Sequence, residues 1–469
     1  MGSGSHADGP GSGARRLRER IQASLRRESI VAFGRTAPNP AVAAVVVARN
    51  HHGEVQIFSG GTEPAGRRHA EIVAFDSLDS FDEFTRASNT PDALAFTARR
   101  IYVTLEPCSH HGRTPPCTTR ILKYPELNYV VIYTPDPSLP ESGCDILRNH
   151  GRRAMIRNNA TQPRYGEAFL SGFLSRVAGC GPRLHFKAAV TSDGFLGVRD
   201  RRLSISGPTA FAVGQFLRAK LDAVLVGPGT IQTDLPALVL RPRQLHAMTS
   251  VRRTAGRDVF YDALFAEETA VRAAIQNASA EYQPLRVFIL GRPFERAAEF
   301  LTAQAQLTAA TGRAPAFAVL PGHFDAWRRL IDRAEFDRDE TSIASDAHGI
   351  GLKQLPTLDD PNFAPITRAY LGQLGCNEVL VEGGARLFRA LQSDARPQDR
   401  TYLLRSDRSL AEILHGAGQD ISAEGSDGSG ALAASDSSGV VAPEWLSAAA
   451  PLATYDLGGD LLEVRPARD

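Results

Sequence analysis

The sequence predicts an α/β protein built from two domains. Short β-branched runs, such as 41–48 and 222–227, alternate with stretches of helical spacing, such as 208–220. A chain of 469 residues has room for two or three domains, at roughly 100–200 residues per domain. No apolar run reaches the length of about 18 residues that a membrane-spanning helix needs, so no membrane partner is expected.

The first half of the chain alternates strands and helices, which predicts a three-layer α/β domain over residues 15–178. Residues 1–14 are expected to be a flexible tail, and residues 79–97 to be irregular because they are polar. The expected helices are 15–29, 69–78 and 118–124, with Ile72, Val73 and Phe75 as core candidates of the second. The expected strands are 41–48, 55–61, 100–107 and 129–134, the first preceded by a break at Pro38 and Pro40.

A second domain is expected over residues 182–469. An insertion with some helix is predicted near 243–284, where no strand pattern is seen. The tract near 418–440 is rich in Gly, Ser, Ala and Asp, and its lack of large apolar side chains predicts disorder. The expected strands are 184–190, 222–227, 286–291, 317–321, 377–384 and 461–466, and the expected helices are 208–220 and 385–392.

The charge balance and the number of cysteines limit the classes of function that the chain can have. Lys plus Arg is 53 and Asp plus Glu is 52, a balance that argues against a nucleic-acid partner, because strand-binding proteins normally carry a basic surface. Five cysteines are too few for a disulfide scaffold, and the number is odd. This predicts a reducing compartment, the cytoplasm, where cysteine serves metal binding or catalysis.

Three residues predict a zinc site. His69 is followed by Cys108 and Cys117, and one imidazole with two thiolates suits tetrahedral zinc with one position open for water. Glu71 stands two residues from His69 and is the expected proton carrier, because zinc lowers the pKa of bound water to roughly 7. His-x-Glu followed by Pro-Cys-x-x-Cys is the signature of zinc deaminases of bases. Here eight residues, including the alternative ligands His110 and His111, separate the two cysteines; buried core cysteines are the other interpretation.

The segment from Pro107 to Cys117 resembles the signature of the bifunctional riboflavin-biosynthesis deaminase/reductase family. Pro38-Asn39-Pro40 and His69-Ala70-Glu71 are similar to the two motifs that precede it. The resemblance implies a cytidine-deaminase-like α/β/α domain. Its implied reaction is hydrolytic loss of the 2-amino group from 2,5-diamino-6-(5-phosphoribosylamino)pyrimidin-4-one.

Residue by residue, the resemblance implies one zinc per chain on His69, Cys108 and Cys117, and Glu71 as the catalytic proton shuttle. It also implies that Asn39 contacts the pyrimidine, and that Arg113 and Thr114 lie near the phosphate, for which Arg is a bidentate partner. The chain departs from the family pattern at Ala43, usually Gly, and at Thr62, usually His.

The second half resembles the reductase domain of the same family, through residues 187–194, 226–230 and 381–385. The implied fold is dihydrofolate-reductase-like, and the implied reaction is NADPH-dependent reduction of the ribosyl group to ribityl. The resemblance implies cofactor contacts at Ala189, Thr230, Asp234 and Gly384. It implies substrate contacts at Lys187, Arg218, Leu238, Arg241 and Glu382.

The chain departs from the family pattern at more positions in this half, namely Ser204, Leu235, Leu290 and Gly291. They keep a rival interpretation open, an active deaminase with a degenerate reductase domain. A second rival interpretation comes from another class of function. It is a nucleic-acid or nucleotide deaminase, or a noncatalytic zinc-binding module. The preferred interpretation is a bifunctional enzyme acting on a small phosphorylated pyrimidine, with a monomer and a homo-oligomer both open.

Overall fold

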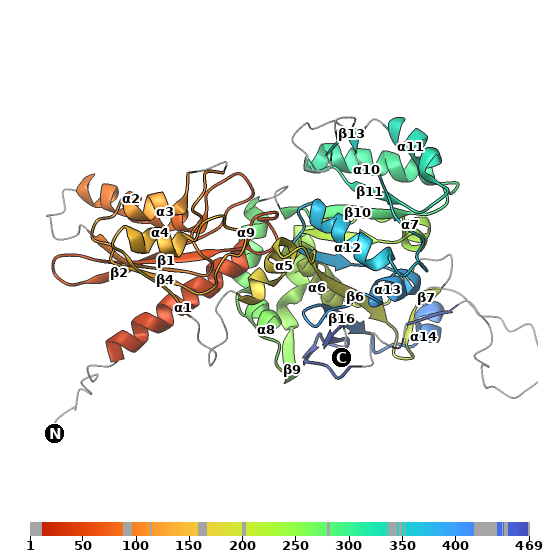
Figure 1. Ribbon diagram of the computed structural model, residues 1–469. Coiled ribbons are helices and arrows are strands. Elements are labelled where there is room, and N and C mark those ends of the chain that lie inside the picture. The colour runs from red at the N-terminus through yellow and green to blue at the C-terminus, as the bar shows by residue number, and fades with distance from the viewer. Residues whose placement is uncertain are drawn as a thin grey trace, which may run out of the picture. The chain divides into compact units, whose positions relative to one another are not determined.

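The computed structural model describes residues 12–87, 96–112, 115–157, 167–198, 203–278, 282–334, 336, 345–346, 349–350, 352–416, 439–442, 444 and 449–467. The chain divides into two compact units. The first holds the residues up to Ala178 together with Ala266–Val271, and the second holds Gly179–Phe265 together with the residues from Arg272 onward. Each unit has its own β-sheet with helices packed on it (Figure 1).

The first unit contains five strands and five complete helices among the described residues. The strands are β1 (Ala43–Arg49), β2 (Val55–Gly61), β3 (Thr97–Val103), β4 (Tyr129–Ile132) and β5 (Arg153–Ile156). The helices are α1 (Ser12–Ala32), α2 (Ala70–Ala87), α3 (Cys117–Leu122), α4 (Gly143–Asn149) and α5 (Glu167–Val177). The strands form one sheet in the order β2-β1-β3-β4-β5. β1 pairs antiparallel with β2 and β3, while β3, β4 and β5 run parallel.

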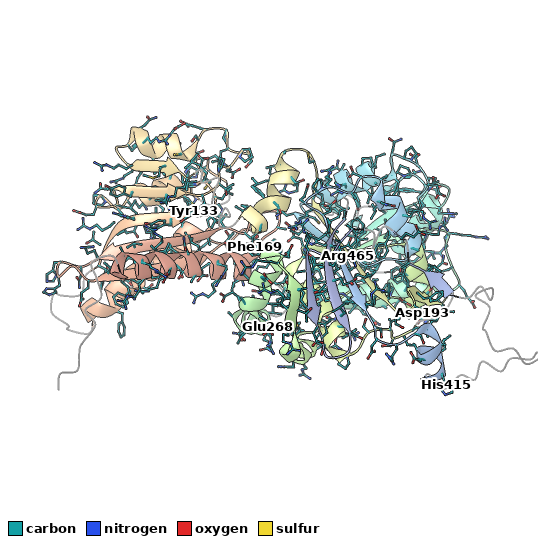
Figure 2. All side chains as sticks on the ribbon, turned by 90° about the horizontal axis from the view of Figure 1, so that it is seen from below. Tyr133, Phe169, Asp193, Glu268, His415 and Arg465 are labelled. Carbon is teal, nitrogen blue, oxygen red and sulfur yellow. The ribbon has the colours of Figure 1, made fainter. Side chains whose placement is uncertain are left out.

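β1 is buried on both faces of the sheet, which makes this unit three-layered. Successive strand side chains point to opposite faces. Val45 belongs to the apolar cluster that includes Leu25 of α1, and Val46 belongs to the cluster that includes Phe75 of α2. The end of α1 is also anchored, because Phe33 meets Phe169 of α5 (labelled in Figure 2) edge-on, with ring centroids 5.5 Å apart.

A glycine permits the close approach of β2 and α2. A Cβ on Gly60 would lie 2.7 Å from the Ala70 carbonyl oxygen and 2.7 Å from the Ala74 nitrogen. Gly60→Ala is therefore expected to lower the free energy of unfolding by about 1–3 kcal/mol, as overpacking does, and denaturant unfolding measures the change. Gly112→Ala is the matched control, because a Cβ there has open space; equal stability of the two variants would contradict the prediction.

The second unit is built on a ten-stranded sheet, in the order β14-β11-β10-β8-β15-β6-β16-β19-β18-β9. Its strands are β6 (Arg183–Val190), β8 (Ala223–Val226), β9 (Arg252–Gly256), β10 (Leu285–Leu290), β11 (Ala316–Val319), β14 (Leu352–Gln354), β15 (Glu378–Val381), β16 (Arg400–Arg405), β18 (Ala453–Asp456) and β19 (Leu461–Pro466). The strands from β14 to β16 run parallel, and β19, β18 and β9 extend the sheet with antiparallel pairs. Two further pairs are β7 (Phe195–Val198) with β17 (Gly439–Val441), and β12 (Ser345–Asp346) with β13 (Gly349–Ile350).

The remaining helices belong to the second unit, except that residues 266–271, at the end of α8 and the start of α9, belong to the first. They are α6 (Pro208–Lys220), α7 (Pro228–Asp234), α8 (Val259–Ala266), α9 (Glu268–Ala278), α10 (Ala297–Thr311), α11 (Phe324–Asp332), α12 (Phe363–Gln373), α13 (Ala385–Gln392) and α14 (Leu410–Gly416), with a 3-10 segment η2 (Pro242–Ser250). Phe186 of β6, Val381 of β15 and Phe388 of α13 share one buried cluster.

The predicted α/β class is confirmed by these two sheets and their helices. Within the described residues, no helix is both long enough and apolar enough to cross a membrane.

Three sequence-based expectations require correction. α2 continues to Ala87, although residues 79–97 were expected to be irregular. The cause is tertiary: Asp79 accepts hydrogen bonds from Arg120 at 2.6 Å and Tyr124 at 2.8 Å, so its polarity serves helix packing. The segment 243–284 contributes β9 to the large sheet as well as helix. Gly439 and Val440, the end of the tract expected to be disordered, form part of β17, while 417–438 lie outside the described residues.

Candidate functional sites

The candidate metal ligands come from three places that the first sheet brings together. His69 directly precedes α2, and its carbonyl accepts the Val73 amide, so it stands at the start of that helix. Cys108 lies in the segment after β3, and Cys117 is the first residue of α3. The buried Thr104 ties this segment to β1, because its hydroxyl accepts from the Ala43 amide at 2.9 Å.

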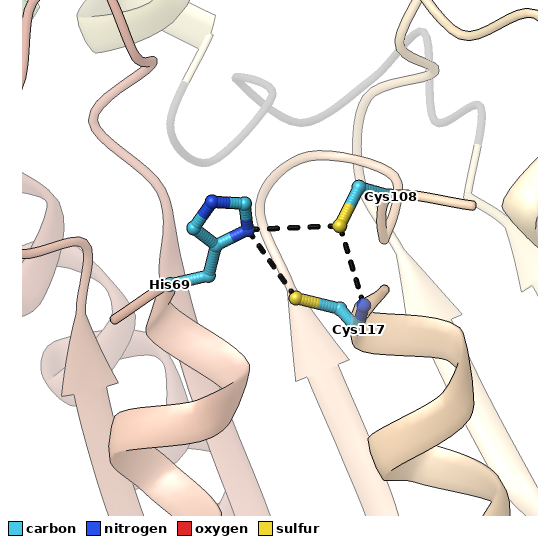
Figure 3. A group of neighbouring side chains, drawn as sticks. All are labelled: His69, Cys108 and Cys117. Carbon is cyan, nitrogen blue, oxygen red and sulfur yellow. Dashed lines mark hydrogen bonds between the residues drawn. The ribbon is translucent and has the colours of Figure 1, made fainter. Parts of the chain in front are cut away.

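The three side chains converge on one point (Figure 3). His69 Nδ1 lies 3.6 Å from Cys108 Sγ and 3.4 Å from Cys117 Sγ. The backbone amide of Cys117 donates to Cys108 Sγ at 3.2 Å. All three ligand atoms lie within 4.8 Å of one another. Among the described residues this group includes neither His110 nor His111, both of which are exposed.

Cys108 is the readily ionised member of this cluster. Hydrogen bonds from the Cys117 thiol and from His69 lower the pKa of Cys108 to about 4, against the opposing effect of burial. A hydrogen bond with Cys108 raises the pKa of His69, and the imidazole must lose its proton before Nδ1 can bind a metal ion. One imidazole and two sulfurs, one of them readily ionised, form a donor set that fits zinc.

Glu71 lies beside this cluster and is shielded from solvent. Its side chain is buried in the first turn of α2. Burial raises the pKa of Glu71 to about 7, and the nearby Cys108 adds to the effect. A carboxyl group with a pKa near neutrality is suited to accept and return a proton.

The other predicted contacts of the first unit are only partly described. Asn39 is half-buried and is held in a tight turn, since its amide donates to the Thr36 carbonyl at 2.8 Å. Thr62, where the related family usually has His, is buried and its hydroxyl accepts from the Val42 amide at 3.2 Å. Arg113 and Thr114 lie outside the described residues.

In the second unit the structure brings Lys187, Arg218 and Glu382 together. Arg218 donates two hydrogen bonds to the Glu382 carboxylate, at 3.0 and 2.5 Å. Burial lowers the pKa of Lys187, and Glu382 and Arg218 are the charged groups that act on it. Burial opposes ionisation of Glu382, but Arg218 and Lys187 hold its pKa below the usual value. The result is a mostly buried group of two cations and one anion.

The predicted cofactor contacts lie at the carboxyl end of a parallel strand or on the helix that follows one. Thr230 and Asp234 lie on α7, which follows β8, and Gly384 caps α13 after β15. Ligands of open α/β sheets bind at this edge. Ala189 shares a face of β6 with Lys187, because side chains two apart point the same way.

Leu238 and Arg241, the other two predicted substrate contacts, lie in the segment between α7 and η2. Leu238 is buried, with a left-handed backbone at φ 53°. Arg241 is exposed, and its amide donates to Gln215 at 2.9 Å. Gln215 is buried and stands one turn from Arg218 on α6. Sequence reasoning missed Gln215, because a lone glutamine in a helix gives no signal until its hydrogen-bond partner is known.

The chain resembles known proteins both in sequence and in fold. No protein-family model matches the chain. It is 32% identical over 209 residues to the riboflavin biosynthesis protein RibD of Buchnera aphidicola, covering 44% of this chain and 50% of that protein. It is 34% identical over 210 residues to RibD of Mycobacterium tuberculosis, covering 44% and 56%. The chain thus spans about half the length of the curated relatives it matches.

Solved structures extend the likeness in fold. Acinetobacter baumannii RibD matches with a TM-score of 0.57 and 21% identity, covering 97% of this chain and 99% of that one. A Thermotoga maritima structure, described as a diaminohydroxyphosphoribosylaminopyrimidine deaminase/5-amino-6-(5-phosphoribosylamino)uracil reductase, matches with the same TM-score of 0.57 and 21% identity, over 97% and 99%. The molecule therefore has the two-sheet α/β fold of these structures. Over about 44% of its length the chain is homologous to the riboflavin biosynthesis proteins RibD, which confirms the resemblance seen in the sequence.

Proposed function

We propose that this chain is a bifunctional enzyme of riboflavin biosynthesis. Its first unit is a zinc-dependent deaminase of 2,5-diamino-6-(5-phosphoribosylamino)pyrimidin-4-one, and its second unit reduces the ribosyl group of the product with NADPH. The observation that carries the first activity is the convergence of His69, Cys108 and Cys117 beside the buried Glu71. Homology to RibD supports the pairing of the two activities. The cytoplasm is the proposed location, consistent with five cysteines outside any disulfide.

In the proposed deamination, His69, Cys108 and Cys117 hold one zinc ion. When bound, zinc supplies a Lewis acid that makes water nucleophilic near neutral pH. Glu71 would take one proton of the attacking water and give it to the ring nitrogen. It would then move the second proton, from the newly formed hydroxyl group, to the amino group, which leaves as ammonia as the C–N bond breaks. Asn39 orients the pyrimidine, and Arg113 with Thr114 binds the phosphate.

In the proposed reduction, Lys187, Arg218 and Glu382 surround the sugar, with Leu238 and Arg241 as further substrate contacts. Ala189, Thr230, Asp234 and Gly384 face the cofactor. A Cβ on Gly384 would meet nothing within 4 Å, and Gly384 caps the start of α13, the end of a helix at which amides can bind a phosphate group. NADPH supplies the hydride, and the chain's own residues bind and orient the sugar for it.

A deaminase with a degenerate reductase domain is the second candidate. Leu290, where the related family has a polar residue, is buried, and Gly291 packs closely against Pro228. Leu235 also departs from the family pattern and adopts a left-handed φ of 43°. Oxidation of NADPH by the purified chain on the deaminated intermediate decides between the two candidates.

Metal analysis with a coupled assay tests the proposal. We expect one zinc per chain, ammonia release and NADPH oxidation on the proposed substrate. Removal of zinc by a chelator should abolish ammonia release but leave NADPH oxidation on the deaminated intermediate, since none of the candidate ligands lies in the second unit. Undiminished ammonia release by metal-free protein would refute the deaminase mechanism.

A further inference from the structure

A buried carboxylate supports the segment that carries Cys108. Glu106 is 7% exposed and stands two residues before this cysteine. Its Oε1 accepts from the Ser142 hydroxyl at 2.6 Å and from the Cys144 amide at 3.0 Å. Its Oε2 accepts from the Asp136 amide at 3.2 Å. One side chain thereby fixes both the loop after β4 and the first turn of α4.

The same turn of α4 contacts the backbone on either side of Cys108. The Ser109 hydroxyl donates to the Glu141 carbonyl at 2.5 Å. A Cβ on Gly143 would overlap the Pro107 carbonyl oxygen, so the two backbones are in direct contact. The Cys108 backbone is thus packed against a turn whose position depends on Glu106.

Cys108 is also joined to α3, which carries the other thiol. Its carbonyl accepts from the Thr118 amide at 3.2 Å and from the Thr118 hydroxyl at 3.3 Å. Thr118 Cγ2 would in turn lie 3.3 Å from a Cβ on Gly143. The first turns of α3 and α4 therefore enclose the Cys108 backbone between them.

We propose that Glu106 is a positioning residue for the metal centre, which holds Cys108 Sγ at the distance from His69 Nδ1 that a single ion requires. This inference rests on the proposed zinc site. Glu106 does not touch the ligand sulfur in the contacts described; it acts through the backbone of residues 107–109. Three hydrogen bonds to a buried carboxylate make this support stiff, because each unmade bond leaves a buried polar group unsatisfied.

Zinc affinity of the full-length chain tests the proposal, measured by competition with a chromogenic chelator. Glu106→Ala should raise the Kd for Zn²⁺ by about 10–100-fold, the effect typical of lost supporting contacts in metal sites. Glu106→Gln retains an acceptor oxygen for Ser142 and Cys144 and should raise the Kd less. The visible spectrum of the Co²⁺-loaded protein should change in Glu106→Ala, because it reports thiolate coordination geometry.

Asn50→Ala is the matched control. Asn50 is likewise buried and organises a turn, accepting from the Glu54 amide at 2.9 Å, but it lies beyond the opposite end of β1 from Ala43. The Asn50→Ala variant should have a lower melting temperature than wild type but the same zinc affinity. An equal loss of zinc affinity in Asn50→Ala and Glu106→Ala, or no loss in either, would overturn the positioning role.

A second measurement separates this inference from the proposed function. Alkylation of Cys108 in metal-free protein, followed by peptide mass spectrometry, should be faster in Glu106→Ala than in wild type or Asn50→Ala. A wild-type chain that binds no zinc refutes the metal site, but the alkylation rates still decide whether Glu106 holds Cys108. Unchanged rates would refute the positioning role even if zinc binds.

Discussion

Glu71→Gln is expected to eliminate ammonia release while leaving one zinc per chain. The amide matches the carboxyl group in size, so the buried first turn of α2 and the His69 position are retained. It cannot accept the proton of the nucleophilic water, and a positioned acid–base group contributes about 10²–10⁴-fold to such steps. The rate of ammonia release under saturating substrate measures the loss, and elemental analysis measures the zinc.

Glu126→Gln is the matched control for this prediction. Glu126 forms an exposed ion pair with Arg99, with side chains 53% and 44% exposed, and exposed pairs contribute little to stability. Its ammonia release should equal that of wild type. Near-normal turnover by Glu71→Gln would show that another group moves the proton, whereas loss of zinc in that variant would show that Glu71 supports the metal.

The ligand cluster could be predicted because its signal is local in the sequence. His69 and Cys117 stand at the starts of α2 and α3, and Cys108 lies in the segment after β3. Each belongs to a short motif that can be recognised in the sequence. Glu106 could not be assigned a task in the same way. Its hydrogen-bond partners are two amides and a hydroxyl in residues 136–144. A contact with backbone groups distant in the chain does not require particular residue types, so the sequence carries no motif for it.

The missed elements of the fold also have physical causes. β9 is exposed along its whole length, so it has no alternation of apolar and polar side chains to detect. Its strand conformation depends on pairing with β18 at the edge of the large sheet. β5 is another case, since only Ala154 of its four residues is buried. Strands such as 41–48 were predictable because burial on both faces demands continuous apolar sequence.

The ion pair between Arg218 and Glu382 was not predicted from the sequence, where the resemblance only assigned each residue to the substrate. Arg218 on a helix is in most proteins a solvated position, yet here its side chain is 19% exposed and that of Glu382 is 13% exposed. The two residues lie 164 positions apart in the chain. Parallel pairing of β15 with β8 and β6 brings the segment that begins at Glu382 to the same edge as Lys187, and no local signal reports that contact.

Glu382→Ala is expected to lower the free energy of unfolding of the second unit by about 3–5 kcal/mol, the usual effect of removing one partner of a buried ion pair. Arg218 would lose both hydrogen bonds from its guanidinium to the carboxylate, and Lys187 would lose its nearby anion. Glu382→Gln should be less destabilising, because the amide oxygen still accepts one of the two hydrogen bonds. Denaturant unfolding followed by fluorescence measures both changes.

The same variants separate a binding role from a purely structural one. If Glu382 orders Arg218 and Lys187 around the sugar, Glu382→Gln should lose NADPH oxidation at a temperature where it remains folded, while ammonia release by the first unit continues. Glu299→Gln is the control, because Glu299 pairs with Arg296 on the exposed surface of α10, at 58% and 54% exposure. A folded Glu382→Gln variant with full reductase activity would assign the pair to stability alone, and would leave Lys187 as the charged side chain of this group that serves the sugar.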